Sequence, residues 1–180
     1  YGEQRGLVDE NCRKLRPKSP YAEIKIKEEN ILKRNKNKNK YVSYRFGTIS
    51  GVSKGMRFHT AVNKFCWQAV MGQSLTVWKT AYHQKRPYLG LDDLNAAIVH
   101  VFQHNIYDNN IYNIVSANCT VKDIVDIIKK YVKNTKLGFV DHEIMNQLSY
   151  EISNKKFMNK GFQFESNIEE KIKNTIKSLI

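Results

Sequence analysis

Short apolar runs alternate along the chain with longer stretches whose apolar positions recur every three or four residues. Four short runs rich in β-branched and aromatic residues are typical of strands: residues 41–46, 75–78, 111–115 and 138–140. Five stretches have helical spacing: residues 21–33, 59–71 and 92–103, and two helices opened by Thr120 and Ser166. Because strands and helices alternate throughout, the pattern predicts an α/β layered architecture.

Capping signals indicate where two of these helices begin, and apolar positions indicate which helix faces point inward. Thr120 is followed by Asp123, and Ser166 by Glu169, at the three-residue spacing of a capping box. Over residues 92–103 we expect one set of side chains to face inward: Leu94, Ala97, Ile98, Val101 and Phe102. The last helix should present a second apolar set on one face: Ile168, Ile172, Ile176 and Leu179. Elsewhere, the sequence predicts the tail of a strand at Tyr1–Gly2, a loop over residues 3–20 and a turn at Gly47–Gly51.

Length and composition are those of a globular domain. A chain of 180 residues and 21.0 kDa can bury a core, and its length predicts one domain. Its longest apolar runs, such as Ile124–Ile128, are too short to span a bilayer, and the first residues do not resemble a signal peptide. Three widely spaced cysteines, Cys12, Cys66 and Cys119, favour a reduced compartment. We therefore expect a cytoplasmic protein with no membrane partner.

The histidines and cysteines do not predict a metal site. His100 and His104 lie four residues apart on an expected helix and could in principle share a metal. No third ligand accompanies them, so a solvated helix face is the preferred interpretation. The sequence therefore predicts no metal ion.

The charge of the chain raises the question of nucleic-acid binding. The formal net charge is +13, and Lys33–Lys40 is a basic run interleaved with asparagine. Surfaces that follow a phosphate backbone usually use more arginine and place aromatic rings for base stacking. The run also falls between an expected helix and an expected strand. A solvated loop is therefore the preferred interpretation, and nucleic-acid binding is the disfavoured one.

The most informative segment places a tyrosine and a lysine on one helix face. Tyr21 and Lys25 are four residues apart, so both side chains project from the same side of the expected helix. A nearby ammonium favours the phenolate form of a tyrosine. Such a tyrosine can remove a proton from a hydroxyl group. The pair alone has little specificity, because the same spacing arises by chance on many helices.

The segments around this pair resemble extended short-chain dehydrogenases/reductases, the NAD-dependent nucleotide-sugar epimerase/dehydratase family. In that family a Tyr-Gly precedes a Ser-Pro-Tyr-x-x-x-Lys, and later strands and loops carry further landmarks. This chain has similar landmarks in the same order: Tyr1–Gln4, Val8–Glu10, Pro17–Lys25, Arg45–Gly51, Arg86–Leu94, Ser149–Ser153 and Gly161–Phe162. Together they span nearly the whole chain, which makes the set far more specific than any single motif.

The resemblance implies a role for each matching residue. Tyr21 would be the catalytic acid/base in hydride transfer at a sugar carbon, and Lys25 would favour its phenolate and hydrogen-bond the ribose of NAD, or of NADP. Arg86 would contact the diphosphate of a nucleotide-sugar substrate, a role suited to a guanidinium. Asn63 would hold the same diphosphate through its side-chain amide. Alternatively, Arg86 pairs with Asp92 or Asp93 and Asn63 is an exposed helix residue.

Several positions depart from the family pattern. Thr48, at a substrate-contacting turn, stands where many members have asparagine, and Asn146–Gln147 stand where an arginine often binds the second phosphate. Trp78 and Tyr88 are expected to be packing residues rather than platforms for base stacking.

The resemblance also implies how the chain is organised. No glycine-rich dinucleotide-binding turn occurs in it. The implied fold is the carboxy-terminal part of a Rossmann-type fold with a small mixed α/β substrate-binding lobe. Residues 1–58 would end the Rossmann-type part, and 59–180 would form mainly the lobe. We expect the amino-terminal dinucleotide-binding part to be absent, and the chain alone to be inactive.

Two alternatives stay open beside the enzyme. One is a non-catalytic half-domain that binds a nucleotide sugar or a partner chain, although an exposed parallel sheet edge disfavours it. The other is a basic nucleic-acid-binding protein, whose affinity would fall steeply with salt. Family members often dimerise through the helix that carries the tyrosine, so the resemblance also implies a homodimer.

Overall fold

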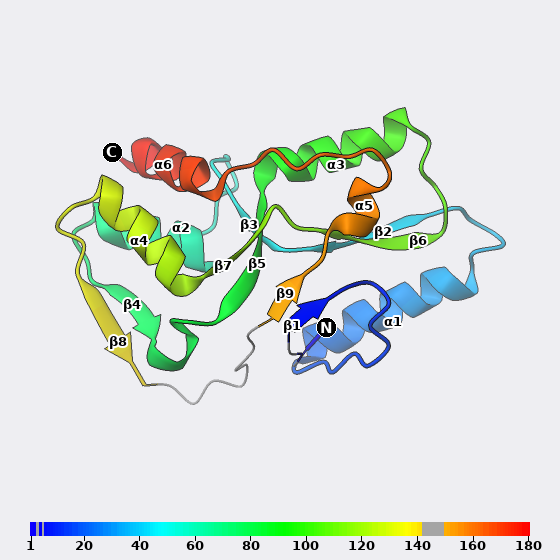
Figure 1. The fold of residues 1–180 in the computed structure, drawn as a ribbon, viewed down its shortest axis with the longest axis horizontal. Helices are drawn as coiled ribbons and strands as arrows, with labels where there is room; N and C mark the ends of the chain where they lie inside the picture. Colours follow the sequence, from blue (N-terminus) through cyan, green and yellow to red (C-terminus); the bar gives the residue numbers. More distant parts are fainter. Residues whose placement is uncertain (3, 5, 142–149) are drawn as a thin grey trace.

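The computed structural model describes residues 1–180 except residues 3, 5 and 142–149 (Figure 1). The strands are β1 (Gly6–Val8), β2 (Val42–Phe46), β3 (Thr48–Ser50), β4 (Leu75–Trp78), β5 (Lys85–Gly90), β6 (Asn110–Ile114), β7 (Ala117–Thr120), β8 (Leu137–Val140) and β9 (Tyr150–Ile152). The helices are α1 (Pro20–Arg34), α2 (Ala61–Val70), α3 (Leu91–Gln103), α4 (Val121–Tyr131), α5 (Lys155–Met158) and α6 (Ile168–Leu179), with a 3₁₀ turn η1 (Lys79–Ala81). None of these helices is long and apolar enough to cross a membrane.

Parallel pairing dominates the short sheets. β2 pairs with β6, β4 with β8 and β1 with β9, all in parallel. β5 lies between β3, which it pairs in parallel, and β7, which it pairs antiparallel. The predicted α/β class is therefore confirmed. In Figure 1, β5 runs between a part that contains α2, α4 and α6 and a part that contains α1, α3, β2 and β6.

Two apolar cores lie on either side of β5. The larger one joins α2, α4 and α6 with β4, and its fully buried residues include Cys66, Leu75, Ile124, Ile128 and Ile172. We call this part of the molecule the lobe. The second core joins α3, β6 and α5 around Tyr112, Ile114 and Phe157. Tyr88 of β5 belongs to the lobe core and Leu89 to the other, so β5 connects the two.

Most predicted elements are present, but the amino-terminal region and one turn differ. Gly2 forms only an isolated parallel bridge to Arg16, not the tail of a strand, and its φ of +71° is one that glycine favours. The expected loop over residues 3–20 contains β1, and the expected turn at Gly47–Gly51 contains β3. β3 forms because its backbone pairs with β5 in register Thr48↔Tyr88.

Two expectations about helix details are wrong. In α3, Ala97 and Val101 are buried, but Ile98 and Phe102 are 38% and 68% exposed, so the inward face is narrower than expected. The cap of α6 is Asn167 rather than Ser166, because the Asn167 side chain accepts the amides of Glu169 and Glu170. The Ser166 amide instead donates to Asp93. The apolar face of α6 is as expected, with Ile172 and Ile176 buried.

Candidate functional site

Helix α1 presents the predicted tyrosine and lysine at its amino-terminal end. Ser19 caps the helix through a hydrogen bond from the Ala22 amide at 3.3 Å, and Pro20 occupies the first turn. Tyr21 is 70% exposed. The Lys25 Nζ lies 5.6 Å from the centroid of the Tyr21 ring, so the two side chains share a face as the spacing predicts.

The ammonium of Lys25 has an acidic neighbour. It forms an ion pair with Glu28 at 2.8 Å, and both side chains are about half exposed. Hydrogen bonding to Glu28 raises the pKa of Lys25. Lys25 therefore stays protonated over the physiological range, with part of its charge balanced by Glu28.

An ion pair attaches α1 to strand β2. The Arg45 guanidinium donates from Nε and Nη2 to the two carboxylate oxygens of Glu29, each at 2.7 Å. Its planar group also lies 4.6 Å from the centroid of the Tyr1 ring. The Tyr1 hydroxyl in turn donates to Asn113 of β6 at 2.7 Å. These contacts fix the position of α1 relative to the β2–β6 sheet.

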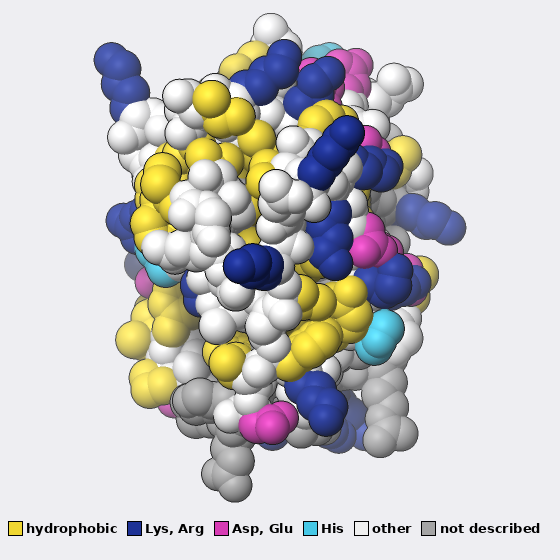
Figure 2. Space-filling view, turned by 90° about the vertical axis from the view of Figure 1, so that its left-hand side faces the viewer, with side chains coloured by type: hydrophobic (Ala, Val, Ile, Leu, Met, Phe, Trp, Pro, Cys, Tyr) yellow, Lys and Arg dark blue, Asp and Glu magenta, His cyan; other side chains and the backbone are white. Residues whose placement is uncertain are grey.

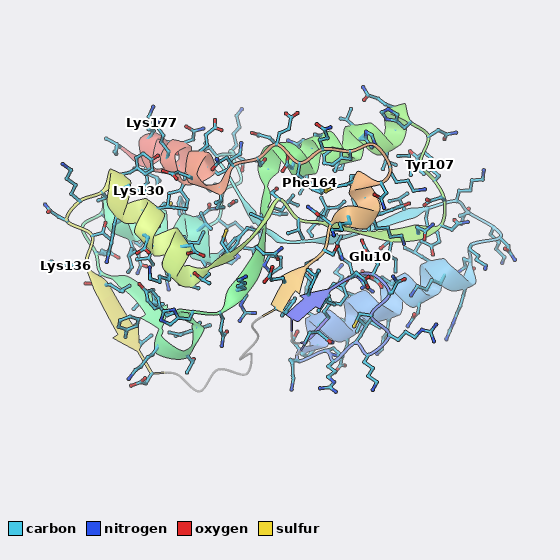
Figure 3. The ribbon with its side chains drawn as sticks, in the orientation of Figure 1. Glu10, Tyr107, Lys130, Lys136, Phe164 and Lys177 are labelled. Carbon is cyan, nitrogen blue, oxygen red and sulfur yellow. The ribbon has the colours of Figure 1, made fainter. Side chains whose placement is uncertain are left out.

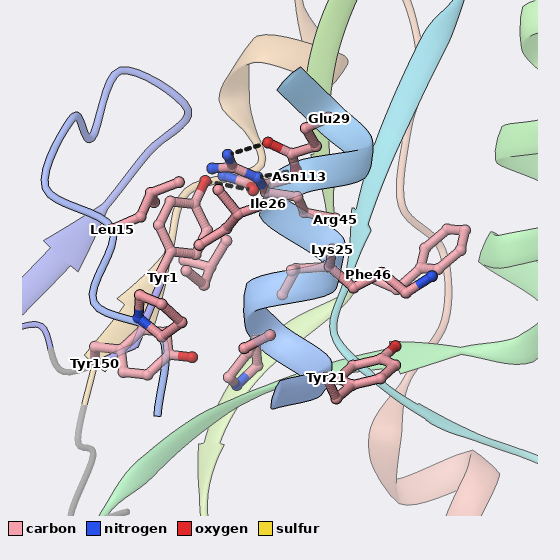
Figure 4. Close-up of a pocket in the computed structure, with 15 residues that line it drawn as sticks. Tyr1, Leu15, Tyr21, Lys25, Ile26, Glu29, Arg45, Phe46, Asn113 and Tyr150 are labelled. Atoms are coloured by element: carbon pink, nitrogen blue, oxygen red, sulfur yellow. Dashed lines mark hydrogen bonds and ion pairs between the residues drawn. The ribbon is translucent and has the colours of Figure 1, made fainter. Parts of the chain in front are cut away.

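A small cavity of about 250 Å³ lies between α1 and this group (Figure 4). Tyr21 and Lys25 line it together with Arg45, Phe46 and Tyr150. In Figure 4 the Arg45–Glu29 pair lies at its upper end, and Tyr21 and Tyr150 lie toward its lower end. Burial raises the pKa of Tyr150, and the nearby charge of Arg86 opposes that shift.

A larger cavity of about 860 Å³ adjoins the first, because Tyr21 and Phe46 line both. Thr48 and Asn63 also line it, so residues from α1, β3 and α2 meet there. Asn63 is 5% exposed, and its amide donates to the Arg57 carbonyl at 3.1 Å. The alternative of an exposed helix position for Asn63 is therefore excluded.

A third cavity of about 580 Å³ contains Arg86. It shares Thr48, His59 and Thr60 with the 860 Å³ cavity, so the three cavities adjoin one another in a row, which we call the groove. All five residues predicted from the sequence line this groove: Tyr21, Lys25, Thr48, Asn63 and Arg86.

Arg86 does not form the ion pair with Asp92 or Asp93 that the alternative interpretation suggested. Asp92 pairs with Lys171, and Asp93 binds Ser116 and the amides of Glu165 and Ser166. The Arg86 guanidinium donates to Gln84 at 3.2 Å. Burial lowers the pKa of Arg86, while nearby Tyr150 opposes the shift. A partly desolvated guanidinium at a cavity wall is chemically suited to an anionic ligand.

Asp93 holds the end of β5 in place. Its carboxylate accepts the Ser116 hydroxyl at 2.5 Å and the Glu165 amide at 3.0 Å, and its side chain is buried. The Ser116 hydroxyl accepts the Gly90 amide at 2.9 Å. The strand that carries Arg86 is thus tied to the β6–β7 turn and to the segment before α6.

Sequence reasoning missed several residues of the groove. Lys64 and His59 line the cavity that contains Arg86, and Trp78 lies at the same wall with 46% of its surface exposed. The packing role expected for Tyr88 is confirmed by its 2% exposure, but Trp78 is not a core residue. One signal could have identified this region, because residues 30–91 contain no Asp or Glu.

Several lysines of the lobe lie away from the groove. In Figure 2, Lys and Arg on the end formed by the lobe are interspersed with apolar and acidic side chains. Figure 3 places Lys130, Lys136 and Lys177 at the outer side of the lobe. Lys130 is paired with Glu169 at 3.1 Å. Over residues 1–141 and 150–180, apart from residues 3 and 5, no group of three His, Cys, Asp or Glu could hold a metal ion. Asn146–Gln147 lie outside the described residues.

Residues 1–115 match the model of a family described as the NAD dependent epimerase/dehydratase family. Among solved structures, UDP-glucose 4-epimerase of Thermus thermophilus in complex with NAD has a TM-score of 0.81 and 22% identity. UDP-glucuronic acid 4-epimerase of Bacillus cereus, with UDP-glucuronic acid and NAD, has a TM-score of 0.85 and 20% identity. The dTDP-glucose 4,6-dehydratase of Bacillus anthracis, with NAD, has a TM-score of 0.83 and 20% identity.

These likenesses establish the fold. They cover 99%, 100% and 98% of this chain, but 60%, 59% and 57% of the three neighbours in the same order. The chain therefore has part of the Rossmann-type fold of these epimerases and this dehydratase, and it spans about three fifths of the neighbours' length.

Proposed function

Because the chain belongs to the NAD-dependent epimerase/dehydratase family, we propose that it is the catalytic and substrate-binding half of an enzyme that converts a nucleotide sugar. The observation that carries the proposal is the groove. Its adjoining cavities are lined by Tyr21 and Lys25 at one end, and by Thr48, Asn63 and Arg86 further along. The neighbours that bind UDP-glucuronic acid and NAD support a nucleotide sugar and NAD, or NADP, as the ligands.

The residues at the α1 end of the groove suit a nicotinamide cofactor. An exposed phenol and an ammonium lie one helical turn apart beside the 250 Å³ cavity, and both can hydrogen-bond the hydroxyls of a ribose. Tyr21 and Lys25 would hold the nicotinamide ribose there. The cofactor, when bound, accepts hydride from a carbon of the sugar. The rest of it would require residues outside this chain, which contains no glycine-rich phosphate-binding turn.

Tyr21 would act as the general base. Tyr21 lines both the 250 Å³ and the 860 Å³ cavity, so a sugar bound in the larger one could present a hydroxyl group to it. The Lys25 ammonium, close to the ring, would stabilise the phenolate after proton removal. Glu28 would moderate this effect, because its carboxylate already pairs with the same ammonium.

The far end of the groove would bind the nucleotide. Arg86 supplies a partly buried positive charge for the diphosphate, and Asn63 retains a second amide hydrogen beyond the one given to Arg57. Trp78 offers a half-exposed indole for stacking of a base. Thr48 lines both larger cavities and would contact the substrate between them.

The proposal also covers the division of the chain into two parts, its dimerisation and its cellular compartment. Residues 1–58 would end the Rossmann-type part and 59–180 would be mainly the lobe, although α3, β6 and α5 pack on the side of β2. Helix α1 buries no residue, and Ile24 and Ile31 are more than half exposed, which supports a homodimer through this helix. A monomeric mass in analytical ultracentrifugation would contradict the proposed homodimer. Three free cysteines support a reduced, cytoplasmic setting.

The decisive experiment is Tyr21→Phe in the protein expressed from its own gene, assayed with NAD and a panel of nucleotide sugars. We expect turnover to fall at least about a hundredfold, because general-base catalysis typically contributes that much or more. Substrate binding should change little, since only the hydroxyl is lost. Tyr131→Phe, on the outer side of α4, is the matched control and should leave turnover intact.

The outcomes separate the alternatives. Turnover unaffected by Tyr21→Phe would rule out this mechanism. Saturable binding of a nucleotide sugar without turnover by the wild-type protein would instead favour a non-catalytic binding domain. Binding only to nucleic acid, with affinity falling steeply as salt rises, would favour the basic nucleic-acid-binding alternative.

A further inference from the structure

The cavity around Arg86 has an unusual charge balance. Its described lining residues include Lys64, Arg86 and His59, and no Asp or Glu is among those described. The adjoining 860 Å³ cavity adds Arg57, and the part of the chain that the structure describes contributes no acidic residue to its lining. Because like charges around a concave surface reinforce one another, this region of the groove favours an anion.

Lys64 is a cation of this cavity whose role the sequence did not indicate. It lies in the first half of α2 with an intermediate exposure. Within the described residues its ammonium makes no ion pair or hydrogen bond, whereas Lys25, Lys85, Lys122, Lys130, Lys160 and Lys171 all pair with acids. A lysine that lines a cavity and lacks an acidic partner is available to a ligand.

The start of α2 adds to the positive character of the same place. Thr60 and Ala61 line the cavity, and the Thr60 side chain does not cap the helix. Amide groups at a helix start that lack a capping side chain carry partial positive charge. Within the described residues, the cavity therefore combines a lysine, an arginine and a helix start, and no carboxylate lines it.

We propose that Lys64 is a second cationic contact to the diphosphate of the ligand, acting together with Arg86. This inference rests on the proposed function for the identity of the ligand, but not for the anionic character of the cavity. Arg86 would give directional hydrogen bonds to one phosphate, and Lys64 would supply a mobile point charge to the diphosphate.

The test is calorimetric titration of the protein expressed from its own gene with the diphosphates of uridine, thymidine, cytidine, guanosine and adenosine, and with inorganic pyrophosphate. The tightest nucleoside diphosphate is then compared with its nucleoside. Lys64→Met keeps the aliphatic stem and removes the charge, so folding should be retained, as circular dichroism can verify. Lys64→Arg restores the charge. Lys79→Met is the matched control, because Lys79 is exposed and does not line the groove.

We expect Lys64→Met to weaken diphosphate binding by roughly ten- to a hundredfold, the range of a hydrogen bond to a charged group. Binding of the nucleoside should stay within about twofold, Lys64→Arg should recover most of the loss, and Lys79→Met should have a much smaller effect. Wild-type affinity in Lys64→Met, or an equal loss in Lys79→Met, would overturn the assignment.

Failure of the proposed function would look different. If pyrophosphate binds and depends on Lys64 while no nucleoside diphosphate binds, the anion site stands and the nucleotide-sugar role fails. If a nucleoside diphosphate binds independently of Lys64, the role stands and the residue assignment fails. If no diphosphate binds at all, both are overturned.

Discussion

Helix α4 buries four side chains, Val121, Ile124, Val125 and Ile128, whereas helix α1 buries none. Both begin with a hydroxyl side chain as N-cap, Thr120 for α4 and Ser19 for α1. Their amino-terminal signals are thus alike. The forces that hold them differ, because α4 packs into the apolar core of the lobe and α1 does not.

Helix α1 is held largely by polar contacts. Its Glu29 binds Arg45 of β2 through two hydrogen bonds, and both side chains are mostly buried. Apolar burial is strong and non-directional, whereas a bidentate ion pair fixes orientation. A bidentate ion pair therefore suits a helix that must hold Tyr21 and Lys25 at the groove. By this comparison, α4 mainly stabilises the fold, whereas α1 mainly fixes the positions of Tyr21 and Lys25.

The largest expected effect tests the first half of this comparison. Ile128→Ala should lower the free energy of unfolding by about 2–5 kcal/mol, because Ile128 is fully buried and the change leaves a cavity. Ile24→Ala on α1 is the matched variant, and it should change that free energy by no more than about 0.5 kcal/mol, since Ile24 is 52% exposed. Urea denaturation measures both, and equal losses would break the comparison.

A smaller effect tests the ion pair of α1. Glu29→Gln should lower the free energy of unfolding by about 1.5–3 kcal/mol, because Arg45 keeps its charge in a mostly buried position. Burial, the largest single influence, lowers the pKa of Arg45, but the hydrogen bonds and charges of Glu29 and Tyr1 together outweigh burial and raise that pKa.

The neighbouring Glu28→Gln is the control for the ion pair. It changes the same chemical group, but the Glu28–Lys25 pair is half exposed and should contribute at most about 0.5 kcal/mol. Hydrogen exchange of the α1 amides should accelerate in Glu29→Gln alone. If both variants behave alike, α1 is held by something other than this pair.

The difference between the helices also explains what the sequence could predict. The helix opened by Thr120 was readable because Thr120 and Asp123 have the spacing of a capping box, and that cap is confirmed. β5 was not recognised as a strand, since Lys85, Arg86 and Pro87 interrupt any alternation, and it forms by pairing with two distant strands. Ser166 was misassigned as a cap because its contact with Asp93 is 73 residues away in sequence.

The residues of the groove were predictable only where a motif marked them. The four-residue spacing of Tyr21 and Lys25 predicts that they share one helix face. The assignment of Arg86, Asn63 and Thr48 came from a family resemblance rather than from any local pattern. Lys64 and Trp78 carry no motif, and they are identified only because α2, β4 and β5 bring them to one wall. Their roles, like those of the predicted residues, stay predictions until the variants are measured.

The smallest expected effect is the pH dependence of stability that the N-terminal cap of α4 contributes and the cap of α1 does not. Hydrogen bonding from Thr120 lowers the pKa of Asp123 below its ordinary value of 3.8, because the carboxylate accepts the Thr120 amide. A carboxyl group whose pKa is lower in the folded state stabilises the fold above its unfolded pKa. That stabilisation is lost as the pH falls through the folded pKa. The stability of the wild-type protein should therefore fall slightly more than that of Asp123→Asn below about pH 4.

At neutral pH Asp123→Asn should be less stable than the wild type by only about 0.3 kcal/mol, since the site is exposed and close to the helix start. Urea denaturation of both proteins at several pH values measures the difference. Helix α1 offers no such dependence at its cap, because the Ser19 hydroxyl does not titrate over this range. A stability difference that stays constant between pH 7 and pH 3 would mean that the Asp123 carboxylate does not support the cap.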